Sequence, residues 1–199
     1  MMPSADFSFA GDANAWRKAV RSGAVKAREA LPIEQQAAMT VALSTHLEAL
    51  LTQLSPTALA FCWPYRNEPD LRPLMMRWLN GAASRTALLP VVLEKNSPML
   101  FRRWIPDMKM AHDRHGIPYP SEGPAAQPDV VLVPVNAFDP AGFRLGYGGG
   151  YFDRTLARIH PVAIGVGFEL GRVDSVRPQS HDRPMDWIVT EKGAFRPTR

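Results

Sequence analysis

Apolar residues recur at the spacing of an α-helix in several stretches of the chain. The longest stretch begins at Pro32 and Ile33, and proline is common at a helix start because the first turn leaves its N–H groups unpaired anyway. The leucines that would share one buried face follow at helical intervals: Leu43, Leu47, Leu50, Leu51 and Leu54. We expect further helices over residues 15–31, over residues 71–79 and from about Tyr151.

Short, continuous apolar runs between these stretches predict buried β-strands. The clearest run covers residues 129–135, with the sequence Asp-Val-Val-Leu-Val-Pro-Val. The other runs cover residues 57–63, 86–93, 99–104, 162–168 and 186–190. Residues 106–127 form a long irregular stretch, and loops of this length are usually functional or mobile.

The alternation of strands and helices predicts the fold class. Strands that are separated by helices imply a mostly parallel sheet with helices on both faces. We expect one α/β domain over residues 15–193, with three layers, α/β/α, and a Rossmann-like sheet. We expect residues 1–14 to be a flexible N-terminal segment and residues 194–199 a C-terminal tail. In such folds ligands bind beyond the carboxyl ends of the strands.

Composition and charge narrow the class of protein. The 199 residues are 46% hydrophobic and 21% charged, which suits one folded domain with a sizeable core. The net charge of +4 is spread along the chain, and this favours a small anionic ligand over nucleic acid. Cys62 is the only cysteine, so an intramolecular disulfide is excluded and a reducing, cytoplasmic setting is expected. No apolar run approaches the roughly 20 residues that cross a bilayer.

The most informative stretch joins the expected strand at residues 129–135 to the expected helix at Tyr151. Its glycines remove β-carbons from the turn, so backbone amides can approach a phosphate closely: Gly146, Gly148, Gly149 and Gly150. Arg144 and Arg154 bracket them with guanidinium groups that suit phosphate. Asp153 is either a helix-start residue or a magnesium ligand. The glycines could also serve only the backbone angles of a turn, since their spacing matches neither the dinucleotide fingerprint nor a P-loop.

Other candidate residues have plainer alternatives. Arg17, Arg21 and Arg28 would share one helix face within roughly 40°, and that face is either solvated or turned toward an anion. His112 and His115 lack a third ligand at a convincing spacing, so we do not expect a zinc site.

Several motifs together resemble one protein family, the 5-formyltetrahydrofolate cyclo-ligases, also called 5,10-methenyltetrahydrofolate synthetases. The resemblance is carried by the run from Arg144 to Arg154, by Val133-Pro-Val-Asn-Ala-Phe-Asp before it and by His181-Asp-Arg-Pro-Met-Asp-Trp-Ile-Val-Thr-Glu after it. Trp63-Pro-Tyr-Arg-Asn-Glu-Pro-Asp resembles an earlier substrate segment of the family. The basic stretch that contains Arg17 and Arg28 resembles the family's first helix. The similarity covers about residues 16–193.

The resemblance implies an ATP-dependent ligase that cyclises 5-formyltetrahydrofolate to 5,10-methenyltetrahydrofolate through a phosphorylated formyl intermediate, with release of ADP and phosphate. It implies ATP contacts from Arg17, Arg144, Leu145, Gly146, Tyr147, Gly148, Gly149, Gly150, Tyr151 and Phe152. It implies folate contacts from Trp63, Glu68, Tyr147, Gly148, Gly149, Gly150 and Tyr151. Arg144, Tyr151 and Asp153 are the expected catalytic residues, and Asp153 and Asp182 the expected magnesium ligands. We expect a monomer whose partners are these small molecules, without nucleic acid or membrane.

Alternatives stay open at the level of single residues and of function. Trp63 could be simple core, Glu68 a loop carboxylate and Asp182 a turn former. A sugar-phosphate isomerase or an acyl-CoA transferase would share the layered architecture without needing ATP. A nucleotide- or RNA-binding module would use the basic helix and would show a steep salt dependence.

Four departures from the family pattern are visible, and one is an insertion of about four residues, close to one helical turn, between Arg17 and Arg28. No lysine stands a few residues before Arg17, Tyr119 stands where the family has a carboxylate, and Phe152 replaces the second of two paired tyrosines. The amino-terminal phosphate contacts and the roles of these positions therefore cannot be carried over from the family.

Overall fold

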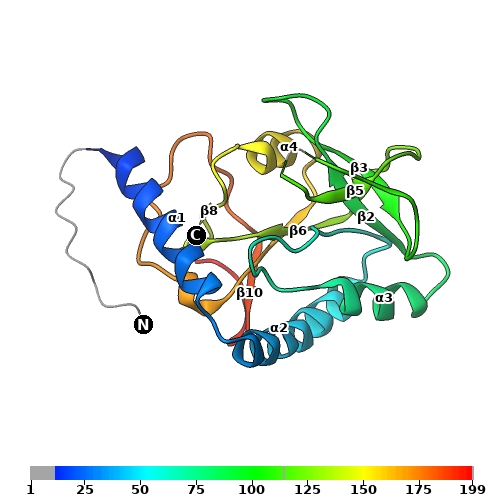
Figure 1. Cartoon of the computed structure of the whole chain (residues 1–199), viewed down its shortest axis with the longest axis horizontal. Coiled ribbons are helices and arrows are strands. Elements are labelled where there is room, and N and C mark those ends of the chain that lie inside the picture. Colours follow the sequence, from blue (N-terminus) through cyan, green and yellow to red (C-terminus); the bar gives the residue numbers. More distant parts are fainter. Residues whose placement is uncertain (1–11, 114, 199) are drawn as a thin grey trace.

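The computed structural model (Figure 1) describes residues 12–113 and 115–198. Its helices are α1 (Ala13–Glu29), α2 (Ile33–Leu54), α3 (Arg72–Asn80) and α4 (Tyr151–Ile159), with a 3₁₀ turn, η1, at Glu169–Gly171. The main sheet contains β1 (Ala58–Ala60), β2 (Thr86–Val91), β3 (Leu100–Trp104), β6 (Val130–Pro134), β9 (Val162–Val166), β10 (Trp187–Thr190) and β11 (Gly193–Phe195). Two hairpins stand outside it: β4 (Met110–His112) with β5 (Pro118–Pro120), and β7 (Ala137–Phe138) with β8 (Arg144–Leu145).

The helix boundaries follow from local chemistry. Asp12 Oδ1 accepts the N–H of Asn14 at the start of α1, as an N-cap residue does. α2 ends where Ser55 adopts left-handed backbone with a φ of 48°. α4 begins directly after Gly150, whose φ is 63°, and glycine reaches that region without strain. The glycine-rich turn and α4 therefore form one continuous unit.

The main sheet has the strand order β11-β10-β9-β6-β1-β2-β3. The five inner strands are parallel, and the edge strands β11 and β3 run antiparallel to their neighbours. The chain first builds outward from β1 to β2 and β3, and then returns to place β6 on the other side of β1. The order of construction therefore reverses between β1 and β6, and ligands of open α/β sheets bind at such a switch point.

Helices cover both faces of this sheet, with α4 above and α2 and α3 below in the view of Figure 1. Leu47 of α2 and Leu74 of α3 pack in one core with Leu132 of β6. Leu156 of α4 packs in the other core with Val131, the neighbour of Leu132. Because consecutive strand residues point to opposite faces, one continuous apolar run supplies both cores. The expected three-layer α/β/α fold is confirmed.

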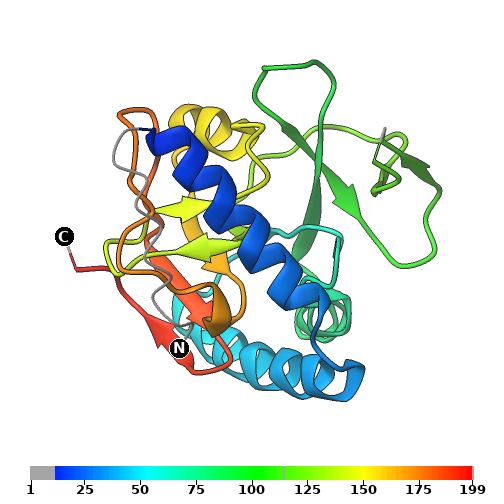
Figure 2. The same cartoon turned by 60° about the vertical axis from the view of Figure 1, so that its left-hand side comes forward.

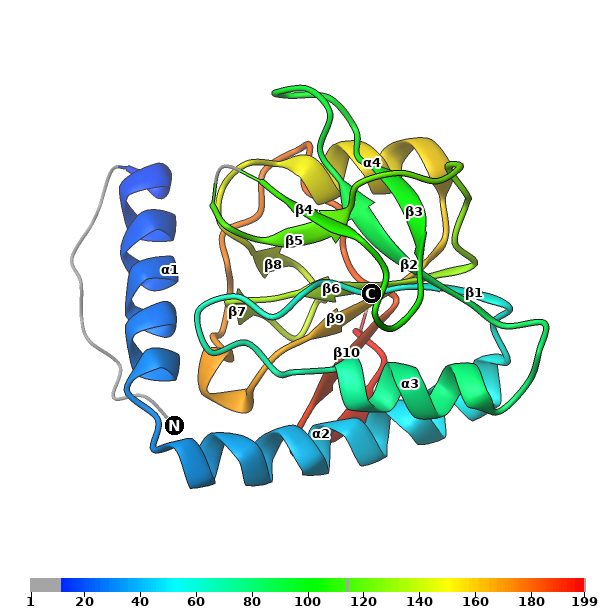
Figure 3. The same cartoon turned by 45° about the vertical axis from the view of Figure 1, so that its right-hand side comes forward.

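α1 stands apart from these layers. Figure 2 shows it running across the β7–β8 hairpin, and Figure 3 shows it upright beside the same hairpin at one end of the sheet. Its apolar contact is small: Ala24 packs with Ala137, Leu145 and Val176. Arginine side chains supply many of its remaining contacts with the rest of the chain.

The stretch at residues 106–127 is more ordered than the sequence predicts, because β4 and β5 form a hairpin within it. Arg102 of β3 holds this hairpin, since its Nη1 donates to the carbonyls of Pro120 and Ser121 at 3.1 and 2.9 Å. Hydrogen bonds from a neighbouring strand thus stabilise a hairpin that its own residue pattern does not predict.

The ordered structure extends beyond both ends of the domain predicted over residues 15–193. Ala13 and Asn14, assigned above to a flexible segment, are the first residues of α1, and residues 1–11 of that segment lie outside the described residues. Ala194 and Phe195, assigned to the tail, belong to β11. Phe195 packs its ring against Phe138 of β7, with the ring centroids 6.2 Å apart, so this contact joins β11 to the β7–β8 hairpin.

Candidate functional site

The candidate site lies beyond the carboxyl ends of β1 and β6, at the switch point. Residues 61–71 lead away from β1, and residues 135–150 lead away from β6. The second segment folds back as the β7–β8 hairpin, and Asp139 closes its turn because its Oδ1 accepts the N–H of Phe143 at 3.0 Å. α1 reaches both segments with its arginines. Three parts of the chain that are far apart in sequence therefore meet here.

The glycine-rich turn, residues 146–150, needs glycine at two positions. Gly148 and Gly150 have φ values of 90° and 63°, in the left-handed region that other residues rarely adopt. Gly148 and Gly149 are exposed. The turn thus presents its backbone to solvent at the first turn of α4.

Two arginines hold the carbonyl groups of this turn. Arg21 Nε donates to the carbonyl of Gly146 at 2.5 Å, and Arg154 Nη2 donates to the carbonyl of Gly149 at 2.5 Å. Within the described residues, no backbone amide of residues 146–151 donates a hydrogen bond to another protein group. Unpaired amides at a helix start attract anions, so the turn has the composition of a phosphate site.

The positive charge around this turn is concentrated. Burial and the nearby charge of Arg17 lower the pKa of Arg21. An anion bound between these groups would relieve their repulsion. The electrostatics of the turn therefore favour a ligand with several negative charges.

Arg144 lies buried behind the turn and organises Asp153. Its Nη2 donates to Asp153 Oδ1 at 3.0 Å, and its Nη1 donates to the carbonyl of Arg183 at 2.7 Å. The N–H of Arg183 also donates to Asp153 Oδ1, at 3.0 Å. Asp153 Oδ2 accepts no hydrogen bond from residues 12–113 or 115–198. Asp153 is thus held firmly by one oxygen and has the other available for a ligand.

Asp182 is engaged by the protein itself. Arg17 Nη1 and Nη2 donate to its two oxygens at 2.6 and 3.2 Å, and the N–H of Gln179 donates at 2.8 Å. Burial alone would raise the pKa of Asp182, but the hydrogen bonds from Arg17 and Gln179 outweigh that effect and hold the pKa below its usual value.

Over the described ranges, no three His, Cys, Asp or Glu side chains gather in a metal-binding group. Magnesium in nucleotide sites is bound by one or two carboxylates together with the phosphates. Asp153 could supply one such carboxylate, and nucleotide phosphates would supply the ligands that do not come from the protein.

An Asp182→Asn variant is expected to lose roughly 2 kcal/mol of unfolding free energy at pH 7, because charge-assisted hydrogen bonds to Arg17 are lost. The pKa of Asp182 is lower in the folded than in the unfolded chain, so its contribution is present above the unfolded value and fades as the pH falls through the folded value. The difference from the unsubstituted chain should therefore shrink below about pH 4. Urea unfolding at a series of pH values measures it, and a difference that is constant with pH would contradict the ion pair.

A second cluster lies between the two loops and α1. Glu68 is only 6% exposed; its Oε1 accepts the Tyr147 hydroxyl at 3.1 Å, and its Oε2 accepts the N–H of Tyr65 at 3.1 Å. Arg28 Nη2 donates to the Tyr147 oxygen at 2.8 Å and lies 4.0 Å from Glu68 Oε1. Burial raises the pKa of Glu68, and the charge of Arg28 and the two hydrogen bonds oppose this rise. Glu68 and Arg28 are buried and Tyr147 is exposed, so the cluster places a buried carboxylate acceptor next to an exposed residue of the glycine-rich turn.

The loop after β1 carries two aromatic rings, Trp63 and Tyr65. Trp63 is half-buried, meets the ring of Trp104 edge-on at 6.5 Å and has the Arg72 guanidinium 4.7 Å from its centroid. The ring of Tyr65 lies edge-on to that of Tyr147 at 5.5 Å. Tyr65 therefore extends from the loop after β1 to the glycine-rich turn, whereas Trp63 packs against β3 and the start of α3.

Three further residues among the predicted ATP contacts have side chains that contact other parts of the protein. Leu145 and Phe152 pack into the apolar cores, so each offers a ligand its backbone. The ring of Tyr151 lies under the Arg154 guanidinium at 5.2 Å. These roles stay predictions.

The basic face of α1 is turned inward. Arg17 and Arg28 are 8% and 3% exposed, so the interpretation as a solvated helix face is wrong for these two residues. Asn136, which the sequence analysis did not assign, belongs to the site because its Oδ1 accepts from Arg28 Nη1 at 2.8 Å. The available signal was an amide directly after a buried apolar strand, where a polar side chain needs a partner.

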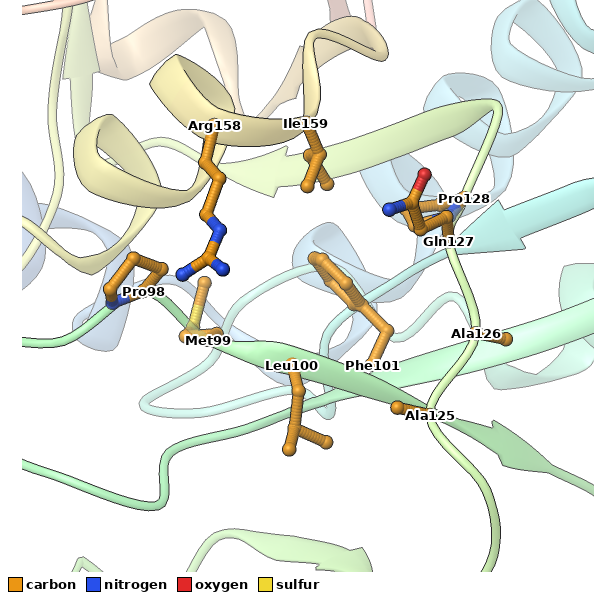
Figure 4. A pocket seen from close by; sticks show the side chains of 10 residues that line it. All are labelled: Pro98, Met99, Leu100, Phe101, Ala125, Ala126, Gln127, Pro128, Arg158 and Ile159. Atoms are coloured by element: carbon orange, nitrogen blue, oxygen red, sulfur yellow. The ribbon is translucent and has the colours of Figure 1, made fainter.

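A pocket of about 430 Å³ lies elsewhere, between the end of α4, the start of β3 and the segment that enters β6. Figure 4 shows Ile159 and Phe101 facing one another across it, with Arg158 reaching toward Pro98 and Met99. None of the predicted site residues lines this pocket.

None of the described helices combines the length and apolar character that a bilayer crossing needs.

Comparisons of sequence place the chain among known proteins. The model of the 5-formyltetrahydrofolate cyclo-ligase family matches residues 13–191. A protein of Haemophilus influenzae named 5-formyltetrahydrofolate cyclo-ligase is 26% identical over 179 residues, which cover 85% of this chain and 94% of the relative. A protein of Escherichia coli K12 with the same name is 29% identical over 173 residues, covering 82% of this chain and 93% of the relative.

Solved structures show the same architecture. The NMR structure of Aquifex aeolicus 5,10-methenyltetrahydrofolate synthetase matches with a TM-score of 0.80 at 27% identity, over 92% of this chain and 93% of that chain. A 5,10-methenyltetrahydrofolate synthetase from Mycoplasma pneumoniae matches with a TM-score of 0.73 at 21% identity, over 88% of this chain and 98% of that chain. At 21% identity, the similarity to the Mycoplasma pneumoniae structure is evidence for the fold alone.

Proposed function

The chain belongs to the 5-formyltetrahydrofolate cyclo-ligase family, and we propose that it uses ATP to close 5-formyltetrahydrofolate to 5,10-methenyltetrahydrofolate. The observation that carries the use of ATP is the glycine-rich turn, whose amides are unpaired within the described residues while Arg21 and Arg154 hold its carbonyls. Tyr147 belongs to this turn, and its hydroxyl donates to Glu68. A phosphate donor on the turn and a folate at Glu68 would therefore be neighbours.

The proposed ATP site runs along residues 144–152. The triphosphate is bound mainly by backbone amides, because Leu145 and Phe152 have their side chains in the cores. Arg21 and Arg154, which bind carbonyls of the turn, supply positive charge beside it. Arg17 and Arg144 are paired with Asp182 and Asp153, and we propose that they contact the phosphates from these pairs. Phosphoryl transfer asks for positioning and charge neutralisation more than for covalent work by side chains, and these residues supply both.

The proposed folate site lies against Glu68, Trp63 and the turn from Tyr147 to Tyr151. The buried Glu68 carboxylate accepts N–H groups of the heterocycle in place of the Tyr147 hydroxyl, and the aromatic rings flank its faces. A site with buried acceptors discriminates strongly against ligands that lack the matching donors.

The proposed reaction has two steps. The formyl oxygen attacks the γ-phosphorus, an O–P bond forms, and the bond from phosphorus to the ADP oxygen breaks. The neighbouring bridge nitrogen then attacks the activated formyl carbon, a C–N bond forms, and phosphate leaves with the former formyl oxygen while the nitrogen loses its proton. Phosphorylation is needed because an amide-like formyl oxygen is a poor leaving group.

Magnesium fits this site through Asp153, whose Oδ2 is available, with Arg144 and the N–H of Arg183 fixing its Oδ1. When bound, the ion would neutralise charge on the phosphates. The prediction that Asp182 also binds the ion stays untested, and its pairing with Arg17 argues for a role in fixing α1 instead.

The test mixes the protein with MgATP and 5-formyltetrahydrofolate and follows the ultraviolet absorbance of the methenyl product. We expect product only with ATP, with one ADP and one phosphate for each product molecule. Substrate labelled with ¹⁸O in the formyl group should yield labelled phosphate, because the formyl oxygen leaves with phosphorus. Equal turnover without ATP would refute ATP dependence, and unlabelled phosphate would refute the phosphorylated intermediate.

A further inference from the structure

The guanidinium of Arg28 is buried and donates to three residues in the two segments that follow β1 and β6. Its Nε donates to the carbonyl of Arg66 at 2.9 Å, its Nη1 to Asn136 Oδ1 at 2.8 Å and its Nη2 to the Tyr147 hydroxyl at 2.8 Å. A guanidinium does not lose its proton in proteins, and a buried one needs a counter-charge. Within the described part of the chain, the carboxylate that pairs with Arg28 is Glu68, at 4.0 Å.

The hydrogen bonds of this cluster run in one direction. Because Arg28 can only donate, the Tyr147 oxygen accepts from it and the Tyr147 hydrogen points to Glu68 Oε1. Glu68 Oε2 accepts the N–H of Tyr65, so both carboxylate oxygens act as acceptors, as suits the ionised group. Burial and the Glu68 charge raise the pKa of two neighbouring groups, the Tyr147 hydroxyl and the Cys62 thiol.

Asn136 fixes the guanidinium from the β6 side. It is 4% exposed, and its oxygen must face Arg28, since a guanidinium offers no acceptor to an amide nitrogen. Asn136 Nδ2 is therefore buried without a hydrogen-bond partner among the described residues. An apolar residue would avoid this unpaired donor. The hydrogen bond that Asn136 Oδ1 accepts from Arg28 explains why an amide side chain stands at this position.

We propose that Arg28 and Asn136 are positioning residues of the folate site, which hold the Glu68 carboxylate and the Tyr147 hydroxyl in the orientation that receives the folate heterocycle. This inference rests on the function proposed above. In this role neither residue needs to touch the substrate. Arg28 acts through Glu68 and Tyr147, and Asn136 acts through Arg28.

Two substitutions of Arg28 separate its charge from its geometry. Arg28→Met should raise the KM for folate at least tenfold. It should also move the acid limb of kcat/KM for folate upward by about one pH unit or more, because Glu68 loses the opposing charge. Arg28→Lys keeps the charge but not the planar fork, so the KM should rise while the acid limb stays in place. The KM for ATP should change less than the KM for folate in both variants, because Tyr147 is the one residue of the glycine-rich turn that Arg28 contacts.

Asn136→Asp tests the same idea with the fold preserved. The substitution keeps the shape, removes the unpaired donor and adds a carboxylate that competes with Glu68 for Arg28. We expect a severalfold higher KM for folate and an acid limb at higher pH. Arg77→Met is the control, because Arg77 is an exposed arginine of α3 whose ion-pair partner is Glu48, and it should change neither quantity.

The outcomes separate this inference from the proposed function. If the unsubstituted chain makes no ATP-dependent product, the proposed function fails. If it is active and the folded Arg28→Met and Asn136→Asp variants keep both the KM and the acid limb, the positioning role is wrong. If Arg28→Met does not fold by circular dichroism, Asn136→Asp decides alone.

Discussion

A Glu68→Gln variant is expected to bind 5-formyltetrahydrofolate about 100-fold more weakly, since a hydrogen bond to a charged group contributes roughly 1.5–3 kcal/mol. The amide keeps one acceptor oxygen but turns an N–H₂ toward either the N–H of Tyr65 or the Tyr147 hydroxyl, which both donate to Glu68. ATP binding should be unchanged, because Glu68 does not contact the glycine-rich turn except through Tyr147. Titration calorimetry with each ligand measures both affinities.

The matched control is Glu29→Gln, which makes the same chemical change at a half-exposed glutamate paired with Arg66. It should leave folate affinity within twofold. The acid limb of folate binding should also disappear in Glu68→Gln, because the titrating group is gone. Equal folate affinity in the Glu68 and Glu29 variants would remove Glu68 from the binding site.

The second large effect is expected for Asp153→Asn, with turnover about 100-fold lower, comparable to the loss of one group that stabilises transition-state charge. The amide oxygen can still accept from Arg144 and from the N–H of Arg183, as Asp153 Oδ1 does. The fold should therefore survive while the negative charge at Oδ2 is lost. Steady-state kinetics at several magnesium concentrations measures the effect, and half-maximal turnover should need more magnesium.

Asp129→Asn supplies the contrast. Asp129 Oδ2 accepts from the N–H groups of Thr57 and Ala58 and from the Thr57 hydroxyl, where β6 begins beside β1. Its substitution should lower the melting temperature and leave turnover unchanged. If Asp153→Asn behaves in the same way, losing only thermal stability, its role is structural and the metal assignment is wrong.

The large elements of the fold follow from the sequence because burial leaves a strong signal. The run at residues 129–135 contains β6 (Val130–Pro134), and both faces of this strand are covered, so no polar residue interrupts it. The helix begun by Ile33 likewise extends to Leu54. The β7–β8 hairpin has no such signal, because each strand is two residues long and depends on contacts such as those of Asp139.

The sequence identifies many individual residues of the candidate site, but it does not identify which residues form hydrogen bonds with one another. The helical spacing predicts that three arginines share one face of α1. It does not predict which groups accept their hydrogen bonds. Arg17 meets Asp182 across 165 positions and Arg28 meets Asn136 across 108. Such pairings are set by how α1 lies over the two loops, which no local pattern of residues encodes.

The central pair of strands has a consequence for synthesis of the chain. Leu59 of β1 lies opposite Val130 of β6, and a ribosome that adds about 5–20 residues each second needs roughly 4–14 s to span that interval. Until then, one edge of β1 carries unpaired N–H and C=O groups, as edge strands do. The nascent chain is therefore most open to association with other chains in that interval, and the arrival of β6 both closes the edge and completes the floor of the site.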